Sequence, residues 1–205
     1  MNSEIIIEVE GLYKTYPGAY HPAVNGISLS IRRGSFFGLL GPNGAGKTTF
    51  LSMLTGLIKP DSGSIRIAGL DIVNKLDEIK HRLSFVPQDT ALYPTLTARE
   101  NLSFFGSMQG LSGPHLCLRI GECLSIADLS NFADSRVDTF SGGMKRRLSL
   151  VVGLLNKPAI LFLDEPTVGI DIQSRHFIYN TLRKMNAEGM TIVYTSHYME
   201  EAEAL

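Results

Sequence analysis

Apolar and polar residues alternate with a period of two in the N-terminal third of the chain. Residues 5–9 form a mostly apolar segment and residues 27–31 alternate strictly. Residues 64–68 alternate in the same way after the turn residues 61–63. Such alternation is typical of strands with one buried and one solvated face. We therefore predict an antiparallel β subdomain near the N-terminus.

Continuous apolar runs mark a second group of strands, at residues 35–40, 84–86, 159–163 and 191–195. The last two runs, which alternate with helices, predict strands buried on both sides, as in a parallel sheet covered by helices. Apolar residues at helical spacing over 49–57 and 172–187 predict two such helices. The pattern as a whole predicts an α/β fold.

Residues 97–155 are expected to be almost entirely helical. Thr97 and Glu100 form a capping-box pattern at the start of a first helix. Further helices are expected over 114–127, with a proline in the first turn, and over 141–155. The chain thus divides into a first core segment at 1–87, an inserted helical subdomain at 88–155 and a second core segment at 156–205.

Composition agrees with one sizeable folded core. The 205 residues are 44% hydrophobic and 19% charged, which is enough apolar material for a single α/β core. The net charge is −1, so no overall field steers the chain to nucleic acid. The densest basic cluster, residues 145–147, is expected to be the solvated face of a helix.

A phosphate-binding loop is predicted by residues 41–48, which match the pattern G-x-x-x-x-G-K-[ST]. The loop consists of Gly41, Pro42, Asn43, Gly44, Ala45, Gly46, Lys47 and Thr48, and Thr49 follows it. Its glycines let backbone N–H groups converge on a polyphosphate at the start of a helix. Lys47 supplies a charge for the β- and γ-phosphates, and Thr48 offers a hydroxyl to Mg²⁺. The apolar run before the loop and the helical pattern after it give the strand–loop–helix context that the motif requires.

Two acidic residues, Asp164 and Glu165, directly follow the apolar run at 159–163. Ligands of an open α/β sheet bind at the carboxyl ends of its strands. Asp164 is therefore expected to hold Mg²⁺ from a second side, directly or through water, and Glu165 to act as the general base on the attacking water. Helix capping is the plain alternative for such acids.

A second anion-binding pattern lies at Ser141, Gly142 and Gly143. Ser141 stands at the N-cap of an expected helix, and the glycines leave bare amides in its first turn. An ordinary cap is the alternative, although each glycine costs a helix about 1 kcal/mol relative to alanine. Two phosphate-binding surfaces in one chain predict two copies with nucleotide between them.

The remaining sequence features exclude several other classes. No apolar run approaches the roughly 18 residues of a membrane span, and the N-terminus lacks the basic region of a signal peptide. Cys117 and Cys123 are expected on different faces of a helix, as reduced, buried thiols. The five histidines show no zinc-ligand spacing, so the expected metal is Mg²⁺ bound with a nucleotide.

The set of motifs resembles the ATP-binding cassette (ABC) transporter ATPases over about residues 4–203. Residues 141–143 are similar to the signature motif of that family. The resemblance implies that Gln88 is the catalytic-site glutamine that senses Mg²⁺ and the transmembrane partner, and that Asp171 is the D-loop aspartate of the nucleotide site. It also implies that His197 is the catalytic switch histidine that faces the γ-phosphate.

The same resemblance places an aromatic ring on the adenine of ATP. Tyr16 falls at the position of that ring, and Tyr13 and Tyr20 are competing candidates nearby. Residues 140–147, 165–171 and 195–202 look like the drug-resistance and polysaccharide or sodium export branch. ATPases of that branch are separate subunits that serve short permeases.

Three features depart from the family pattern. Met144 replaces the commoner glutamine after the double glycine, and residues 168–170 read Val-Gly-Ile in place of Ser-Ala-Leu. The family continues through further strands past the position of Leu205, so the resemblance implies a C-terminal truncation. The aspartate of the D-loop is kept at Asp171.

The resemblance implies an ATP-binding and ATP-hydrolysing subunit that powers export through a separate membrane permease. ATP would join two subunits, most simply as a homodimer, and hydrolysis would release them. We expect a cytoplasmic protein, peripheral on the inner face of the cell membrane, with no nucleic-acid partner. Leu92 and Tyr93 are candidates for the permease contact, with packing on their own helical subdomain as the alternative.

Two other functions are weighed against this one. The first is a soluble ABC-type ATPase that acts on DNA or ribosomes. Repair members carry a long coiled coil between Gln88 and the signature, for which too few residues are present, and translation members usually carry two cassettes. The second is a P-loop small-molecule kinase, which would need an arginine-rich lid and no signature motif.

Overall fold

Two β-sheets form the framework of the protein. The computed structural model describes residues 4–198. The antiparallel sheet has the order β2-β1-β4-β5, from β1 (Ile5–Lys14), β2 (Val24–Arg32), β4 (Ser62–Ile67) and β5 (Leu70–Asp71). The parallel sheet has the order β3-β8-β7-β6, from β3 (Phe36–Leu40), β8 (Thr191–Ser196), β7 (Ile160–Leu163) and β6 (Leu83–Val86).

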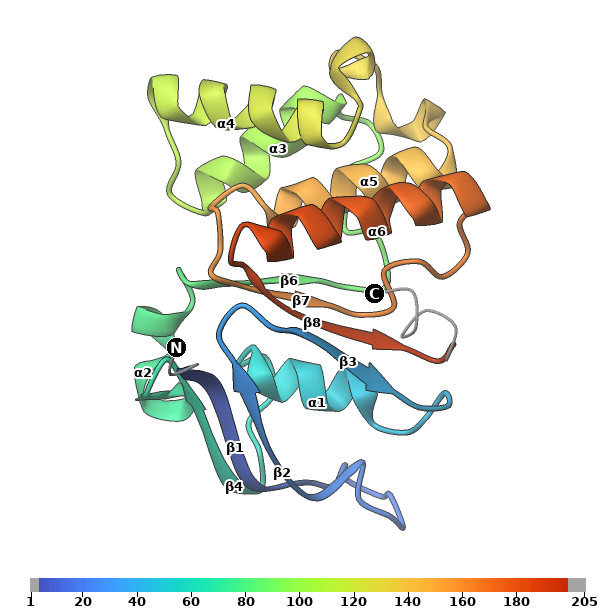
Figure 1. Ribbon diagram of the computed structural model, residues 1–205. Coiled ribbons are helices and arrows are strands. Elements are labelled where there is room, and N and C mark those ends of the chain that lie inside the picture. Colours follow the sequence, from blue (N-terminus) through green and yellow to red (C-terminus); the bar gives the residue numbers. More distant parts are fainter. Residues whose placement is uncertain (1–3, 199–205) are drawn as a thin grey trace.

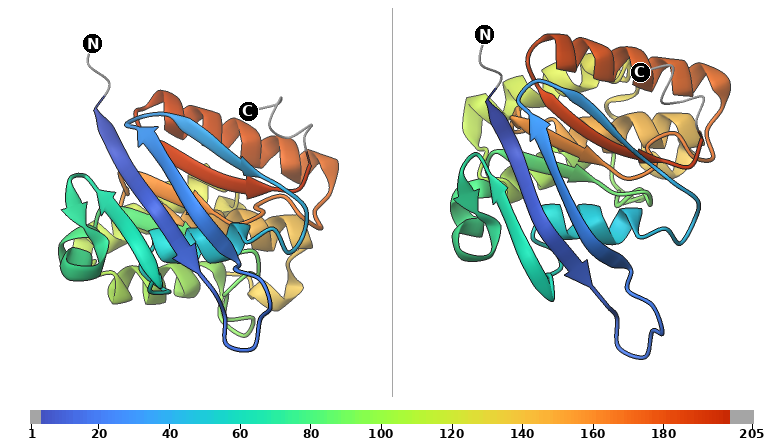
Figure 2. Two further views of the ribbon diagram at one scale, coloured as in Figure 1. Left: turned by 90° about the horizontal axis from the view of Figure 1, so that it is seen from below. Right: turned by 60° about the horizontal axis from the view of Figure 1, so that its bottom comes forward.

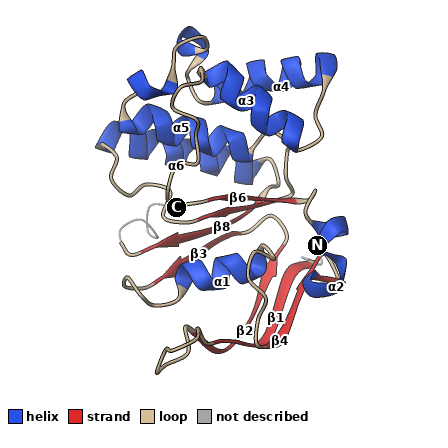
Figure 3. Cartoon of the chain, turned by 180° about the vertical axis from the view of Figure 1, so that it is seen from behind, coloured by secondary structure: helices blue, strands red, loops and turns tan. Residues whose placement is uncertain are grey.

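Helices lie on both faces of the parallel sheet (Figure 1). The helices of the described residues are α1 (Lys47–Leu54), α2 (Ile72–Ile79), α3 (Ala98–Met108), α4 (Gly113–Ile126), α5 (Gly142–Gly153) and α6 (Ile172–Ala187), with short 3-10 turns at Ser130–Phe132 and Val137–Thr139. Helices α5 and α6 cover one face, and α3 and α4 lie beyond them (Figures 1 and 3). Helix α1 covers the other face, and the antiparallel sheet lies across it (Figure 2).

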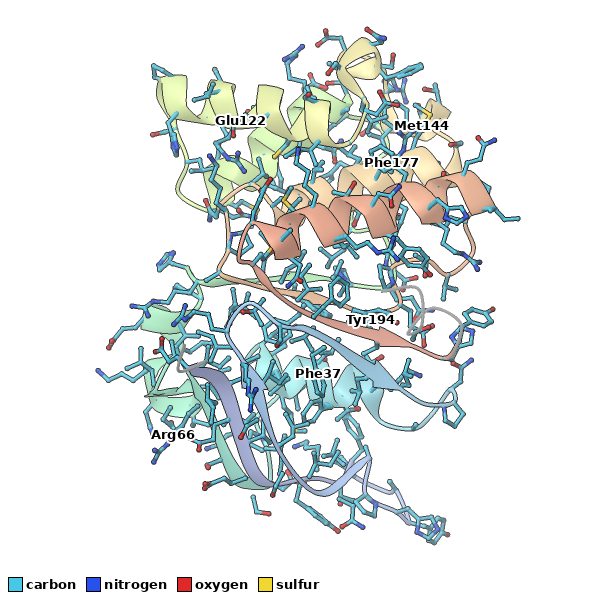
Figure 4. The ribbon with its side chains drawn as sticks, in the orientation of Figure 1. Phe37, Arg66, Glu122, Met144, Phe177 and Tyr194 are labelled. Carbon is cyan, nitrogen blue, oxygen red and sulfur yellow. The ribbon has the colours of Figure 1, made fainter. Side chains whose placement is uncertain are left out.

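The two inner strands, β7 and β8, separate two hydrophobic cores. Leu161 and Leu163 pack with the helical subdomain, while Ile160 and Phe162 pack with α1 and the antiparallel sheet. Successive side chains of a strand point to opposite faces, so a strand buried on both sides feeds both cores. Tyr194 of β8, labelled in Figure 4, belongs to the helical side.

The predicted fold class is confirmed, and most predicted elements are present with small shifts at their ends. Thr97 and Glu100 form the predicted capping box, because Glu100 N donates to Thr97 Oγ1 over 3.1 Å and Thr97 N donates to Glu100 Oε2 over 2.8 Å. The prediction of a helix over 49–57 was wrong at its end. Helix α1 stops at Leu54, Gly56 follows with a φ of 74°, and Leu57 is exposed.

One expectation about burial is confirmed and another needs correction. The strands β7 and β8 are buried on both faces, as predicted, whereas β3 is half-exposed because it pairs only with β8 among the described residues. Both thiols were expected to be buried. Cys123 is, but Cys117 faces solvent from α4, because the two positions lie on different sides of that helix.

Candidate nucleotide-binding site

All four strands of the parallel sheet end at one edge, and each is followed by a predicted motif. The phosphate-binding loop follows β3, Gln88 follows β6, Asp164 and Glu165 follow β7, and His197 follows β8. Because neighbouring strands run parallel, these segments meet. A hydrogen bond joins two of them directly, from Gly41 N to Ser196 O over 3.3 Å.

Gly46 fits the phosphate-binding loop against the antiparallel sheet. It precedes α1 with a φ of 85°, in the left-handed region that favours glycine. A Cβ atom at this position would lie 1.9 Å from the carbonyl oxygen of Ala23, just before β2. Glycine is therefore required both by the backbone conformation and by the close approach of the two segments.

A cavity of about 440 Å³ lies at this edge of the sheet. Residues 43–49 line it, together with Tyr16, Ala23, Gln88 and Glu165. Its volume falls within the range of small-molecule sites. The structure thus brings most of the predicted phosphate loop, Gln88 and Glu165 to one place.

Tyr16 is the tyrosine that reaches this cavity. Its hydroxyl lies 3.3 Å from Thr49 Oγ1, within hydrogen-bond distance. Tyr13 is instead held in β1, opposite Ser62, and Tyr20 is 99% exposed. Of the three candidates, Tyr16 alone lines the cavity.

The Lys47 ammonium is held by three oxygens. It donates to Gly41 O over 2.8 Å and to Pro42 O over 3.1 Å, and it lies 3.2 Å from Glu165 Oε1. Their side chains are only 6% and 8% exposed, so water screens their attraction weakly. The cation of the phosphate loop and the acid after β7 therefore form a buried ion pair.

The two acids after β7 are oriented by one hydroxyl. Thr195 Oγ1 donates to Asp164 Oδ1 over 2.6 Å and accepts from Glu165 N over 3.0 Å. Glu165 has a φ of 44°, which is uncommon for a residue other than glycine. Backbone conformations of this kind cluster at functional sites, where the surroundings hold them in place.

His197 approaches the same acid from β8. Its Nδ1 atom lies 3.3 Å from Glu165 Oε2, and its ring packs on Tyr198 with 3.9 Å between centroids. The predicted catalytic pair is therefore in contact. The rest of the family-like segment after Tyr198 lies outside the described residues.

The signature residues lie apart from the cavity lining in the described chain. Ser141 caps α5, because its Oγ accepts from Met144 N over 3.2 Å. A Cβ on Gly143 would lie 1.9 Å from Ser174 Oγ, whereas one on Gly142 would meet nothing within 4 Å. Asp171 caps α6 by accepting from Ser174 N over 2.8 Å and from Ser174 Oγ over 2.7 Å. Thus Gly143 provides a close contact between α5 and α6, and Gly142 is open.

The expectation of a solvated basic face at residues 145–147 was wrong. Arg146 is buried and donates to main-chain carbonyls of the segments after β6 and β7. Arg147 of α5 lies over the ring of Phe177 of α6, 4.9 Å from its centroid; Phe177 is labelled in Figure 4. Helix α5 lies between the sheet and the outer helices, so most of its sides meet protein (Figure 1).

The donor atoms near the cavity suit a hard cation. Thr48, Gln88 and Asp164 offer hydroxyl, amide and carboxylate oxygens, which Mg²⁺ prefers. Within residues 4–198, no group of three or more His, Cys, Asp or Glu side chains is gathered to hold a metal. This set fits Mg²⁺ bound together with substrate phosphates rather than a cage made by the protein alone.

A larger hollow, of about 590 Å³, lies at the opposite end of the parallel sheet. Its lining includes Arg119, Lys157, Lys184 and Met190 but no predicted site residue.

Every helix in the described range is too short or too polar to cross a membrane.

The fold and the cavity define a P-loop nucleotide-binding protein. The sequence matches the family described as ABC transporter over residues 24–168. It is 48% identical to the linearmycin resistance ATP-binding protein LnrL of Bacillus subtilis (strain 168) over 98% of this chain and 64% of that protein. It is 45% identical to the Nod factor export ATP-binding protein I of Ralstonia nicotianae over 100% of this chain and 63% of that protein.

Solved structures agree with this assignment. A dimeric ATP-binding cassette in a post-hydrolysis state, bound to ADP and Pi, superposes with a TM-score of 0.87 at 30% identity, covering 97% of this chain and 91% of that one. The chain belongs to the ABC transporter family and has the fold of its ATP-binding cassettes. It spans less than two thirds of the length of the curated relatives named above.

Proposed function

We propose that this chain is the ATP-binding and ATP-hydrolysing part of an ABC exporter. The observation that carries the proposal is the buried contact between Lys47 and Glu165, 3.2 Å apart, in a cavity lined by the phosphate loop. It brings a phosphate-binding cation and a candidate base to one point. The names of the relatives, which concern linearmycin resistance and Nod factor export, support export as the direction of transport.

The chemistry follows from the residues around the cavity. The amides of residues 43–49 and the Lys47 ammonium bind the triphosphate, while Tyr16 stacks on adenine. Glu165 accepts a proton from water as the water oxygen attacks the γ-phosphorus and ADP leaves with the bridging oxygen. His197 steadies Glu165 and faces the γ-phosphate.

Thr48, Gln88 and Asp164 are the proposed ligands of Mg²⁺. The bound cation neutralises charge on the β- and γ-phosphates. Asp164 is kept in one orientation by the hydroxyl of Thr195. Gln88 lines the cavity, and the family resemblance supports its role in sensing Mg²⁺ and the membrane partner.

A second copy of the cassette completes the site. Ser141, Gly142 and Gly143 of one subunit contact the ATP held by the phosphate loop of the other, and Asp171 lies beside them. Two observations favour this arrangement: these residues lie outside the lining of the cavity in their own chain, and the solved relative is dimeric. Gly142, which is open, is the glycine best placed to meet the partner's nucleotide.

The permease contact is proposed at Tyr93 rather than at Leu92. Leu92 packs against the core of its own helical subdomain, which was the alternative to a permease contact. Tyr93 is 45% exposed and stacks edge-on against Phe104, with 4.8 Å between ring centroids. Met108 of the same helix as Phe104 is also exposed. A partner in the membrane would place the cassette on the cytoplasmic face.

Two substitutions test the proposed function. Glu165→Gln removes the base and the negative partner of Lys47 together, so it is expected to bind ATP at least as tightly and to accumulate as an ATP-bound dimer. Lys47→Ala is expected to bind ATP about a hundredfold more weakly, because a charged contact to phosphate is lost. Size-exclusion chromatography with and without ATP measures the dimer, and fluorescent ATP measures binding. A Glu165→Gln chain that binds ATP and stays monomeric would contradict the two-subunit site.

A further inference from the structure

Arg146 connects the two loops that carry the proposed chemistry. It lies on α5, five residues after the N-cap Ser141, and is 4% exposed. Its guanidinium donates to carbonyl oxygens of Pro166 (2.6 Å), Pro87 (2.7 Å), Gln88 (2.8 Å), Asp164 (3.1 Å) and Glu165 (3.1 Å). A guanidinium has five N–H groups in a rigid, planar fork, and here each has a main-chain acceptor.

These acceptors come from two different segments. Pro87 and Gln88 follow β6, while Asp164, Glu165 and Pro166 follow β7. The two strands are neighbours in the sheet, and their ladder continues only as far as Asp164 N, which donates to Val86 O over 2.9 Å. Beyond that point Arg146 binds both segments at once and holds Gln88 and Glu165 at a fixed separation.

The charge of Arg146 is kept despite its burial. Burial lowers the pKa of its guanidinium to about 10, and the nearby carboxylates of Asp164 and Asp89 oppose that shift. The group therefore stays protonated at neutral pH. Hydrogen bonds from a charged donor are stronger than neutral ones, so five of them restrain the two loops firmly. One restrained residue is Glu165, whose φ of 44° needs such support.

We propose that Arg146 is a positioning residue that couples the Gln88 loop to the Glu165 carboxylate. A displacement of the Gln88 loop moves the guanidinium, and the guanidinium moves the backbone of Glu165. The inference rests on the proposed function only for the roles of Gln88 and Glu165. The coupling itself rests on the hydrogen bonds.

Arg119 offers a matched control. It is also 4% exposed, lies on α4 and donates to two carbonyls, Leu154 O over 2.6 Å and Leu155 O over 2.9 Å. Its other partners include Glu122, and it lines the hollow at the far end of the sheet. A loss of stability or activity that comes only from burying a lysine in place of an arginine should therefore appear in the lysine variants of both Arg119 and Arg146.

The experiment compares Arg146→Lys with Arg119→Lys in the full chain. A lysine ammonium is a single point with three donors, so it cannot reach both segments in the geometry of the guanidinium fork. Arg146→Lys is expected to lower kcat for ATP hydrolysis by about tenfold to a hundredfold, with the Kd for ATP changed by less than about threefold. Arg119→Lys is expected to keep kcat within about twofold of the unsubstituted chain, with a comparable fall in Tm.

Hydrogen–deuterium exchange gives a readout that does not depend on catalysis. Arg146→Lys should speed exchange in peptides covering residues 84–92 and 164–170 together, and Arg119→Lys should affect neither. Arg146→Gln, which retains one NH₂ group, should give a smaller increase in exchange rate in the same two peptides. It replaces the lysine variant in this experiment if that variant does not fold.

The outcomes separate the inference from the proposed function. Equal kcat values for Arg146→Lys and Arg119→Lys, or faster exchange in only one of the two segments, would overturn the coupling. An unsubstituted chain that does not hydrolyse ATP would overturn the proposed function, and the exchange measurement alone then decides the inference.

Discussion

The Thr195 hydroxyl donates a hydrogen bond to the Asp164 carboxylate, with 2.6 Å between Oγ1 and Oδ1. The same oxygen accepts from the amide of Glu165, so its donor and an acceptor position are both used. One fully buried hydroxyl on β8 therefore sets the orientation of both acids at the end of β7.

Replacing Thr195 by valine should reduce ATPase activity by more than the accompanying loss of protein stability can explain. The shape is kept, but Asp164 and Glu165 lose their common anchor, so kcat is expected to fall by about tenfold and the Mg²⁺ concentration for half-maximal activity to rise. Thr195→Ser should stay close to the unsubstituted chain. The measurement is ATPase rate as a function of Mg²⁺.

Thr191 supplies the control for that substitution. It is buried at the other end of β8, and its Oγ1 accepts from Gly34 N over 2.9 Å. Thr191→Val leaves one amide without its acceptor and should cost about 1–3 kcal/mol of unfolding free energy with unchanged Mg²⁺ dependence. Identical Mg²⁺ curves for the two valine variants would count against the role of Thr195.

The adjacent glycines of the signature should respond differently to alanine. Gly143→Ala places a methyl group where Ser174 Oγ stands, and the expected loss of unfolding free energy is about 1–3 kcal/mol. Gly142→Ala meets no atom within 4 Å and should leave stability unchanged or slightly raised. Urea unfolding followed by circular dichroism measures both.

A compensating substitution checks the cause of the Gly143→Ala effect. Ser174→Gly removes both side-chain atoms nearest to the new methyl group. The double variant should therefore be more stable than the sum of the two single changes predicts. Additive losses would show that the contact between α5 and α6 is not the reason.

Asp61 anchors the loop that carries Tyr16. Its carboxylate lies 2.7 Å from Lys14 Nζ and accepts from Thr15 N over 2.7 Å. Asp61→Asn should loosen the position of the Tyr16 ring beside the cavity and leave the phosphate loop unchanged. ATP affinity is expected to fall by about twofold to fivefold, while tripolyphosphate, which has no base, should bind as before. Calorimetric titration with both ligands gives the comparison.

The pH dependence of this anchor follows from the pKa of Asp61. The hydrogen bond from Lys14, and then the one from the Thr15 amide, lower that pKa below its ordinary value of 3.8. Because the pKa is lower in the folded protein, the stabilisation is complete above 3.8 and is lost only as the pH falls through the lowered value. The fold loss of ATP affinity on Asp61→Asn should therefore stay constant from about pH 5 to 8, because titration of the ligand affects both chains alike. A loss that changes within this range would contradict the assignment.

The two cysteines should differ sharply in reactivity. Cys117 is exposed on α4, whereas Cys123 is fully buried and burial raises the pKa of its thiol to about 11. Thiolate is the reactive form, so a disulfide reagent should modify Cys117 in the folded chain and both thiols only in urea. Mass spectrometry locates the adducts, and Cys117→Ser should abolish the reaction of the folded chain. Rapid modification of Cys123 under native conditions would contradict the packing of α4.

Sequence patterns were sufficient for the part of the site that follows strands. Continuous apolar runs located β3, β6, β7 and β8, and parallel pairing then brought the segments after them together. Asp164 and Glu165 were found in this way, as a local signal joined to a rule of sheet geometry. The phosphate loop was found from its motif, and Gln88 and His197 were assigned through the family resemblance.

Other features of the site have no local sequence signal, because they depend on contacts between distant segments. Arg146 stands between two other basic residues, and its burial depends on the loops after β6 and β7, which are 58 and 18 residues away along the chain. The contact of Gly143 with Ser174 is of the same kind. Helix α2 is a different case, because the Asp71 cap and the spacing of Ile72, Leu76 and Ile79 were visible signals that received no assignment.

The ion pair of Lys47 and Glu165 makes nucleotide loading an exchange of counterions. A phosphate that binds the Lys47 ammonium displaces the Glu165 carboxylate, which lies 3.2 Å from it, so the incoming phosphate releases Glu165 from its ion pair. The free carboxylate is then next to the phosphate that displaced it. In this arrangement the proposed base stays paired with Lys47 until a phosphate takes its place.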